Sequence, residues 1–388
     1  LTPTEIERFK VVYIISASYS IISFPFSTTL NGVLTSYEKF IQMKLCDLVN
    51  KILTVLLIVA ALLNGFGLYA LVAINAAVNL ACFAAKWIVI KTTTPAKVEI
   101  TYWDKALLKE IFGFSVWVLI NSICSRLIMN ICPNILGITS GTVAITMFSF
   151  ASVIEGYVHM FSSAIDGMFM PRIARITYKE ANMEKILPLM IKVGRYQYNL
   201  VGLILIGFAC VGKEFITLWI GKDYLTVYYC AILLMLPAPF YLSQQIGKNT
   251  MVMVNKIRYL TAVNAIKAAL NVALVSIMSL KCGVLGACIS ICIVYFFRNI
   301  ANMYLFKKQL GLDTKTFRKE CYGKMTLPMV ATLAIGLAAN RFVTVHSWVM
   351  LAVKSAVVAC VYLLLMWLFA YNAQEKQIVK NLFKKVLK

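Results

Sequence analysis

The stretch FSFASVIEGYVHMFSSAIDGMFMPR, residues 148–172, is apolar and long, yet it contains Glu155, His159 and Asp166. A membrane core of roughly 30 Å is crossed by about 20 helical residues, so this stretch can span it. On a helix, His159 lies about 40° and Asp166 about 20° from Glu155, which places all three on one stripe. A charge facing lipid at this depth costs roughly 2.5–3.5 kcal/mol or more. We therefore expect the stripe to face protein or water.

The whole chain has the composition of a membrane protein. Hydrophobic residues make up 61% of its 388 residues, charged residues 14%, and the mean hydropathy is +0.80. Eleven segments are continuously apolar, which favours transmembrane helices over the alternating strands of a barrel. They lie near residues 11–34, 45–63, 68–90, 110–135, 142–170, 197–220, 226–252, 257–280, 284–306, 325–342 and 347–371.

Most of the basic residues that produce the net charge of +22 lie in the connections between these segments. Of the 38 Lys and Arg residues, 27 lie in alternate connections and only six in the opposite ones. This asymmetry obeys the positive-inside rule and predicts that the basic connections and the C-terminal NLFKKVLK lie in the cytoplasm. Contact with anionic lipid accounts for the basic patches, so we expect no nucleic-acid partner.

Two parts of the chain repeat one another. Lys39 and Lys256 each begin a basic connection followed by a span, and Gly67 and Gly283 follow 28 and 27 positions later in short turns. Glycine suits such turns, because it adopts positive φ and allows close helix packing. The repeat predicts a period of six spans.

The repeat also predicts the domain organisation. Residues 1–90 would form the second half of a first lobe, 91–109 a cytoplasmic linker, and 110–308 a complete six-helix lobe. Two further helices and a basic cytoplasmic tail would occupy 309–388. With eleven spans and the C-terminus inside, the chain would begin outside with no apolar segment to carry it there. We therefore expect three preceding helices, fourteen in the full protein, and two parallel lobes.

Three segments carry a resemblance to a known group: MFMPRIARI at 168–176, LWIGKDYLTVYYCAILLML at 218–236 and GVLGACIS at 283–290. Their order and spacing resemble the polysaccharide and O-antigen flippases of the MOP (multidrug/oligosaccharidyl-lipid/polysaccharide) exporter superfamily. The resemblance implies an all-α integral membrane protein with two parallel six-helix lobes (MATE/MOP-like) around a cavity that opens alternately to each side. It also implies transport of an undecaprenyl-diphosphate-linked O-antigen, capsule or exopolysaccharide unit across the bacterial inner membrane.

Other functions remain open on the same fold. Related groups include cation-coupled multidrug exporters and lipid II flippases, and a non-transporting scaffold in polysaccharide assembly is a third reading. The chain has no Walker or G-x-S-x-G motif, two His residues, and eleven Cys residues without a C-x-x-C pair. We predict a transporter that is not an enzyme and has no cofactor or metal site. The candidate partners are lipid-linked oligosaccharide, membrane lipids, H+ or Na+ and a polysaccharide polymerase complex.

The ionisable stripe of residues 148–172 has two readings. Glu155, His159 and Asp166 either pair with polar groups on neighbouring helices or form a proton or cation site. The second reading follows because a buried carboxylate holds protons tightly and histidine titrates near neutral pH. Pairing is favoured for Asp166, which lies near the cytoplasmic end of its span.

Arg126 is the first candidate for binding a lipid diphosphate. Such a ligand needs several positive donors, and the guanidinium offers a planar fork of them. Asn130, four residues later, extends the same polar face. The alternative for Arg126 is a salt bridge to Glu155 on the next span.

Four other cations lie within predicted spans. Lys248, Lys267 and Arg298 are weaker substrate-binding candidates, because each could instead reach the cytoplasmic interface by snorkelling. Snorkelling at the outer interface is also expected for Lys354.

Pro237 and Pro239 interrupt the segment 226–252. Proline frees a backbone carbonyl and permits bending, so this pair is either a hinge for alternating access or a static kink.

The segment that follows Pro171, residues 172–197, carries six basic residues and intermittent apolar ones. We expect it to lie along the inner membrane surface.

Overall fold

The computed structural model describes residues 3–96, 103–180, 183–340, 345 and 347–377. These residues are almost entirely helical and include no strand. Nine described helices are long and apolar enough to cross a membrane, so the chain is a multi-pass membrane protein. The prediction of an all-α membrane protein is confirmed. The C-terminal NLFKKVLK and part of the predicted linker lie outside the described residues.

The chain divides into two compact units, Leu1–Asp104 and Lys105–Lys388. The assignment of these units to repeated lobes stays a prediction. Each of the eleven predicted segments overlaps a described helix, but three of them do not correspond one to one with the nine candidate spans. The segment 11–34 lies on a helix that is not among the nine, and the segments 257–280 and 284–306 share one long helix.

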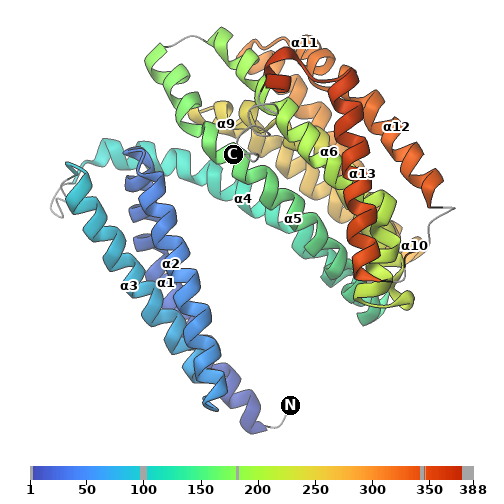
Figure 1. Ribbon diagram of the computed structural model, residues 1–388. Helices are drawn as coiled ribbons and strands as arrows, with labels where there is room; N and C mark the ends of the chain where they lie inside the picture. The colour runs from blue at the N-terminus through green and yellow to red at the C-terminus, as the bar shows by residue number, and fades with distance from the viewer. Residues whose placement is uncertain (1–2, 97–102, 181–182, 341–344, 346, 378–388) are drawn as a thin grey trace, which may run out of the picture. The chain divides into compact units, whose positions relative to one another are not determined.

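In its described residues the first unit contains three helices, α1 (Pro3–Ser36), α2 (Phe40–Leu63) and α3 (Leu68–Thr93), drawn in blue shades in Figure 1. Helix α3 packs against both others. The short turn before α3 does contain a glycine with positive φ, but it is Gly65, at +75°. Gly67, which the repeat singled out, instead begins α3 with a φ of −83°.

The second unit contains ten α-helices among the described residues. They are α4 (Lys105–Thr139), α5 (Gly141–Ala174), α6 (Ile186–Trp219), α7 (Thr226–Met235), α8 (Ala238–Leu242), α9 (Gln245–Met253), α10 (Ile257–Leu310), α11 (Thr314–Arg318), α12 (Lys324–Ala339) and α13 (Trp348–Phe369). Four short helices of other types connect them, η1 (Arg175–Glu180), η2 (Met183–Lys185), η3 (Lys222–Tyr224) and η4 (Lys319–Gly323).

Two buried apolar clusters hold the second unit together. One joins α4, α5, α7 and α10 through residues such as Ile128, Phe148 and Leu234. The other joins α6, α10, α12 and α13 through residues such as Phe306 and Tyr362. Helices α12 and α13 both pack on α6, and Figure 1 shows them beside it.

The long helix α10 is two helices that meet at Gly283. Its φ of 57° and ψ of −137° are non-helical, so the chain bends there between the two predicted spans. The close approach extends to Gly286, where an added Cβ would lie 2.0 Å from the carbonyl oxygen of Met278. The prediction that Gly283 forms a positive-φ turn is confirmed.

Substituting Gly283 with alanine is expected to lower the free energy of unfolding by about 1–3 kcal/mol, because residues with a Cβ rarely adopt this backbone conformation. Thermal unfolding of the purified protein in detergent measures the loss. The control is Gly113→Ala in α4, where an added Cβ meets nothing within 4 Å. That change is expected to stabilise by about 0.4–1 kcal/mol. Equal melting temperatures for the two variants would contradict the strain at Gly283.

The predicted span 226–252 is broken rather than continuous. Pro237 caps the short helix α8 and Pro239 lies inside it, which separates α7 from α9. Broken helices of this kind occur in membranes where their freed polar groups face protein or a cavity. Tyr241 on α8 and Lys248 on α9 therefore lie on short helices that pack against α5 and α10. The hinge function of the two prolines stays a prediction.

Candidate functional site

Glu155 lies on α5 against protein, with only 4% of its surface exposed. Its Oε1 atom accepts a hydrogen bond from the Tyr241 hydroxyl at 3.0 Å and lies 3.0 Å from Nε2 of His159. The Tyr241 hydroxyl also lies 2.6 Å from Nε2 of His159. Tyr241 is buried, whereas the His159 side chain is 43% exposed. The three groups therefore connect a buried carboxylate to an exposed imidazole.

Asp166 contacts a different helix. The Gln197 amide nitrogen on α6 donates to Oδ1 of Asp166 at 2.5 Å and to the Ser162 hydroxyl at 3.3 Å. Gln197 is fully buried, and its Oε1 atom has no hydrogen-bond partner. This geometry fits the reading of Asp166 as a polar contact between helices.

The rings of two tyrosines lie close to two cationic side chains. The Arg298 guanidinium carbon lies 4.1 Å from the ring centre of Tyr241 and 4.6 Å from that of Tyr295. The Lys267 ammonium lies 5.4 Å from the Tyr295 ring centre. Aromatic faces attract cations at these distances, most strongly where water is excluded. Lys267 and Arg298, both on α10, thus lie against aromatic rings of the second unit.

Lys248 on α9 completes a cationic cluster, defined here as Lys248, Lys267 and Arg298. It lies within electrostatic range of Arg298 and Asp166, and Lys267 lies within range of both other cations. Lys267 is only 2% exposed. In the described part of the chain, no ion pair joins any of the three to a carboxylate.

The cationic cluster has unused hydrogen-bonding capacity. Nε and Nη2 of Arg298 are both buried and have no hydrogen-bond partner in the described ranges. A buried donor left unpaired is costly, and positive charges brought close together repel one another. An anion placed among them would relieve both costs.

Arg126 and Asn130 lie elsewhere, on an exposed face of α4. No described hydrogen bond or ion pair joins Arg126 to Glu155, which has Tyr241 and His159 as partners. Helix α4 is joined to α10 by other groups. The Asn264 side-chain amide donates to the Asn121 side chain, and the Asn271 side-chain amide donates to the Ile128 carbonyl. The salt bridge considered for Arg126 is therefore absent from the described residues.

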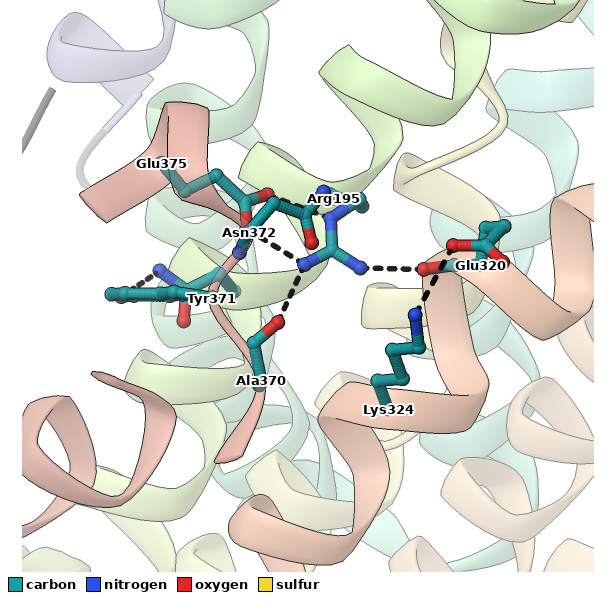
Figure 2. Close-up of polar contacts among 8 residues, drawn as sticks. Arg195, Glu320, Lys324, Ala370, Tyr371, Asn372 and Glu375 are labelled. Atoms are coloured by element: carbon teal, nitrogen blue, oxygen red, sulfur yellow. Dashed lines mark hydrogen bonds and ion pairs between the residues drawn. The ribbon is translucent and has the colours of Figure 1, made fainter. Parts of the chain in front are cut away.

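Arg195 on α6 forms the most extensive buried ion pair among the described residues of the second unit, and no local sequence pattern indicates it. Its Nε and Nη2 atoms each donate to the Glu375 carboxylate at 2.7 Å. It also donates to the carbonyls of Glu320 at 2.6 Å and Ala370 at 2.8 Å, as Figure 2 shows. Arg195 is 1% exposed and Glu375 7%. The contacts tie η4 and the end of α13 to α6.

Two lysines are also buried in ion pairs. Lys354 lies 2.6 Å from Glu214 on α6 and is 8% exposed, so the expectation that it snorkels is wrong. Lys86 on α3 is 3% exposed and binds Asp47 at 2.6 Å and Asn31 at 2.8 Å. In both cases a nearby carboxylate offsets the free-energy cost of burying the lysine ammonium.

No group of three His, Cys, Asp or Glu residues in the described ranges could hold a metal ion. Sequence reasoning missed Tyr241 and Tyr295. The spacing of Tyr295 and Arg298, three positions apart on one helix face, was an available signal. No sequence signal indicates Tyr241, because its partners lie on other helices.

Comparison with known proteins gives a family match and matches to solved structures. The sequence profile of a family described as "Polysaccharide biosynthesis protein" matches residues 10–228. Among solved structures, "Lipid II flippase MurJ, inward closed conformation" matches with a TM-score of 0.63 and 15% identity. The match covers 92% of this chain and 73% of that one, and at such identity it shows the fold alone. No curated protein matches the chain.

Proposed function

Because the chain belongs to the polysaccharide biosynthesis protein family, we propose that it is a flippase for a lipid-linked oligosaccharide. The family match and the shared fold with MurJ confirm the resemblance to the MOP exporter superfamily. The proposed cargo is an undecaprenyl-diphosphate-linked O-antigen, capsule or exopolysaccharide unit. The proposed membrane is the bacterial inner membrane, with the C-terminus in the cytoplasm.

The cationic cluster is the observation that supports this cargo. A lipid diphosphate is anionic, and multiple cationic donors bind it best. Lys248 and Arg298 are partly exposed, and Arg298 has two buried nitrogens without partners. A cationic drug would meet repulsion at the same place. The charge of the cluster therefore favours a diphosphate over the cargo of a cation-coupled exporter.

Tyr241 links this cluster to the candidate coupling site. Its ring lies under Arg298, while its hydroxyl binds Glu155 and contacts His159. A proton entering through exposed His159 would change the hydrogen bonds of the hydroxyl and hence the placement of Tyr241. Proton movement and diphosphate binding would then be coupled through one side chain. Na+ as the coupling ion and a polysaccharide polymerase partner stay predictions.

Complementation tests the function. In a strain that lacks the protein, the full-length gene is expected to restore surface polysaccharide and leave drug susceptibility unchanged. Altered drug resistance with intact glycan would favour the multidrug exporter. A peptidoglycan defect with intact surface polysaccharide would favour lipid II, which the name of the similar structure suggests as the alternative cargo.

Arg126→Ala is expected to lower surface polysaccharide by roughly tenfold or more, because a charged hydrogen bond from the exposed face of α4 to the diphosphate contributes about 1.5 kcal/mol or more. Surface glycan is measured at matched expression. Lys105→Ala, an exposed cation at the start of the same helix, is the control and should keep normal glycan. Normal glycan from Arg126→Ala would remove this residue from the binding site.

A further inference from the structure

A basic pocket lies where α5 ends and α6 begins, outside the cationic cluster. Its volume is about 540 Å³. Three cations line it, Arg172, Lys185 and Lys192, and no Asp or Glu is among its lining residues. Phe169, Ile176 and Leu189 form its apolar wall. The pocket thus combines positive charge with apolar surface at the ends of two membrane-spanning helices.

Buried side chains and a hydrogen bond hold the helix ends around the pocket in place. Arg172 belongs to the last turn of α5, and Lys192 lies near the start of α6. Between them, η1 is a π-helix, a rare conformation that is frequent at functional sites. Ile173 and Ile176 are fully buried, and the Tyr178 hydroxyl donates to the Met253 carbonyl at 2.5 Å. These contacts fix the wall that presents Arg172.

We propose that this pocket binds the headgroup of an anionic phospholipid. Arg172 and Lys192, both exposed and without a described ion pair, would hold the phosphate, while Phe169 contacts the first part of an acyl chain. Basic pockets at the cytoplasmic ends of membrane helices suit anionic headgroups, and basic residues here lie on the predicted inner side. The apolar wall favours a lipid over a free phosphate. The site is independent of the proposed cargo and of its transport.

The test uses the full-length protein, purified in a neutral detergent. Native mass spectrometry counts bound lipid, and thermal unfolding measures stabilisation, with phosphatidylglycerol or phosphatidylcholine added. The wild type is expected to prefer phosphatidylglycerol. In the double variant Arg172→Gln/Lys192→Gln, affinity should fall about fivefold per residue, roughly 25-fold in total.

Two further variants make the result specific to the pocket. Lys308→Gln/Lys315→Gln removes the same charge from exposed positions outside the pocket and should keep the preference. Arg172→Lys/Lys192→Arg preserves the charge and should keep it too, which separates loss of binding from misfolding.

Three outcomes would overturn the proposal. They are an unchanged preference in the Gln pocket variant, an equal loss in the Lys308/Lys315 control, and protection by inorganic phosphate equal to that by phosphatidylglycerol. The last result would identify a phosphate site that does not recognise lipid.

Discussion

Arg195→Ala is expected to lower the free energy of unfolding of the second unit by about 3–5 kcal/mol, because it leaves the buried Glu375 carboxylate without its partner. The guanidinium makes four hydrogen bonds, two to Glu375 and one each to the carbonyls of Glu320 and Ala370. The backbone N–H of Asn372 is the other described donor to the Glu375 carboxylate, at 2.8 Å. One short hydrogen bond does not replace a bidentate pair.

Thermal unfolding in detergent measures this loss, with two comparisons. Lys324→Ala breaks the pair with Glu320, which is 3.7 Å long and exposed, so it should cost about 1 kcal/mol or less. The double variant Arg195→Met/Glu375→Leu removes both charges and should regain most of the stability. If Arg195→Ala melts no earlier than Lys324→Ala, the buried pair is not what joins α13 and η4 to α6.

The features that sequence predicted correctly are local ones. Continuous apolar runs place the helices, because a run of about 20 such residues has few alternatives to spanning a bilayer. Gly283 was predicted as a positive-φ turn, because glycine is the residue that tolerates this backbone. Pro237 and Pro239 interrupt the helix for an equally local reason, the missing amide hydrogen. Even so, the first turn used Gly65 instead of Gly67, since neighbouring glycines are equivalent in sequence.

The features that sequence missed depend on contacts between distant residues. Glu155 and His159 are four positions apart on one helix, so their contact is visible in the sequence. Tyr241, which binds both, lies 86 positions from Glu155. Arg195 and Glu375 are 180 positions apart. Arg195 follows Lys192 in a basic segment and looks like another interface charge, yet the helix turn between them decides that one is exposed and the other buried.

Lys267→Met is expected to lower surface polysaccharide by roughly 10- to 100-fold while the protein becomes no less stable, because a charged hydrogen bond to the diphosphate contributes about 1.5–3 kcal/mol. Stability should hold, because Lys267 is buried next to Arg298 and Lys248 without a carboxylate partner in the described residues. Removing it relieves repulsion and desolvation. Arg298→Gln should lose transport similarly, since two buried nitrogens of Arg298 have no hydrogen-bond partner among the described residues.

Lys354→Met provides the opposite result and makes the test decisive. Lys354 is also buried, at 8% exposed, but it pairs with Glu214 at 2.6 Å. Its removal strands a partly buried carboxylate, so the melting temperature should fall while surface polysaccharide per folded molecule stays normal. Both quantities are measured for each variant at matched expression. Loss of a lysine that serves stability thus lowers the melting temperature, whereas loss of a lysine that binds an anionic cargo lowers surface polysaccharide. Normal glycan from Lys267→Met would show that the cationic cluster does not bind the cargo.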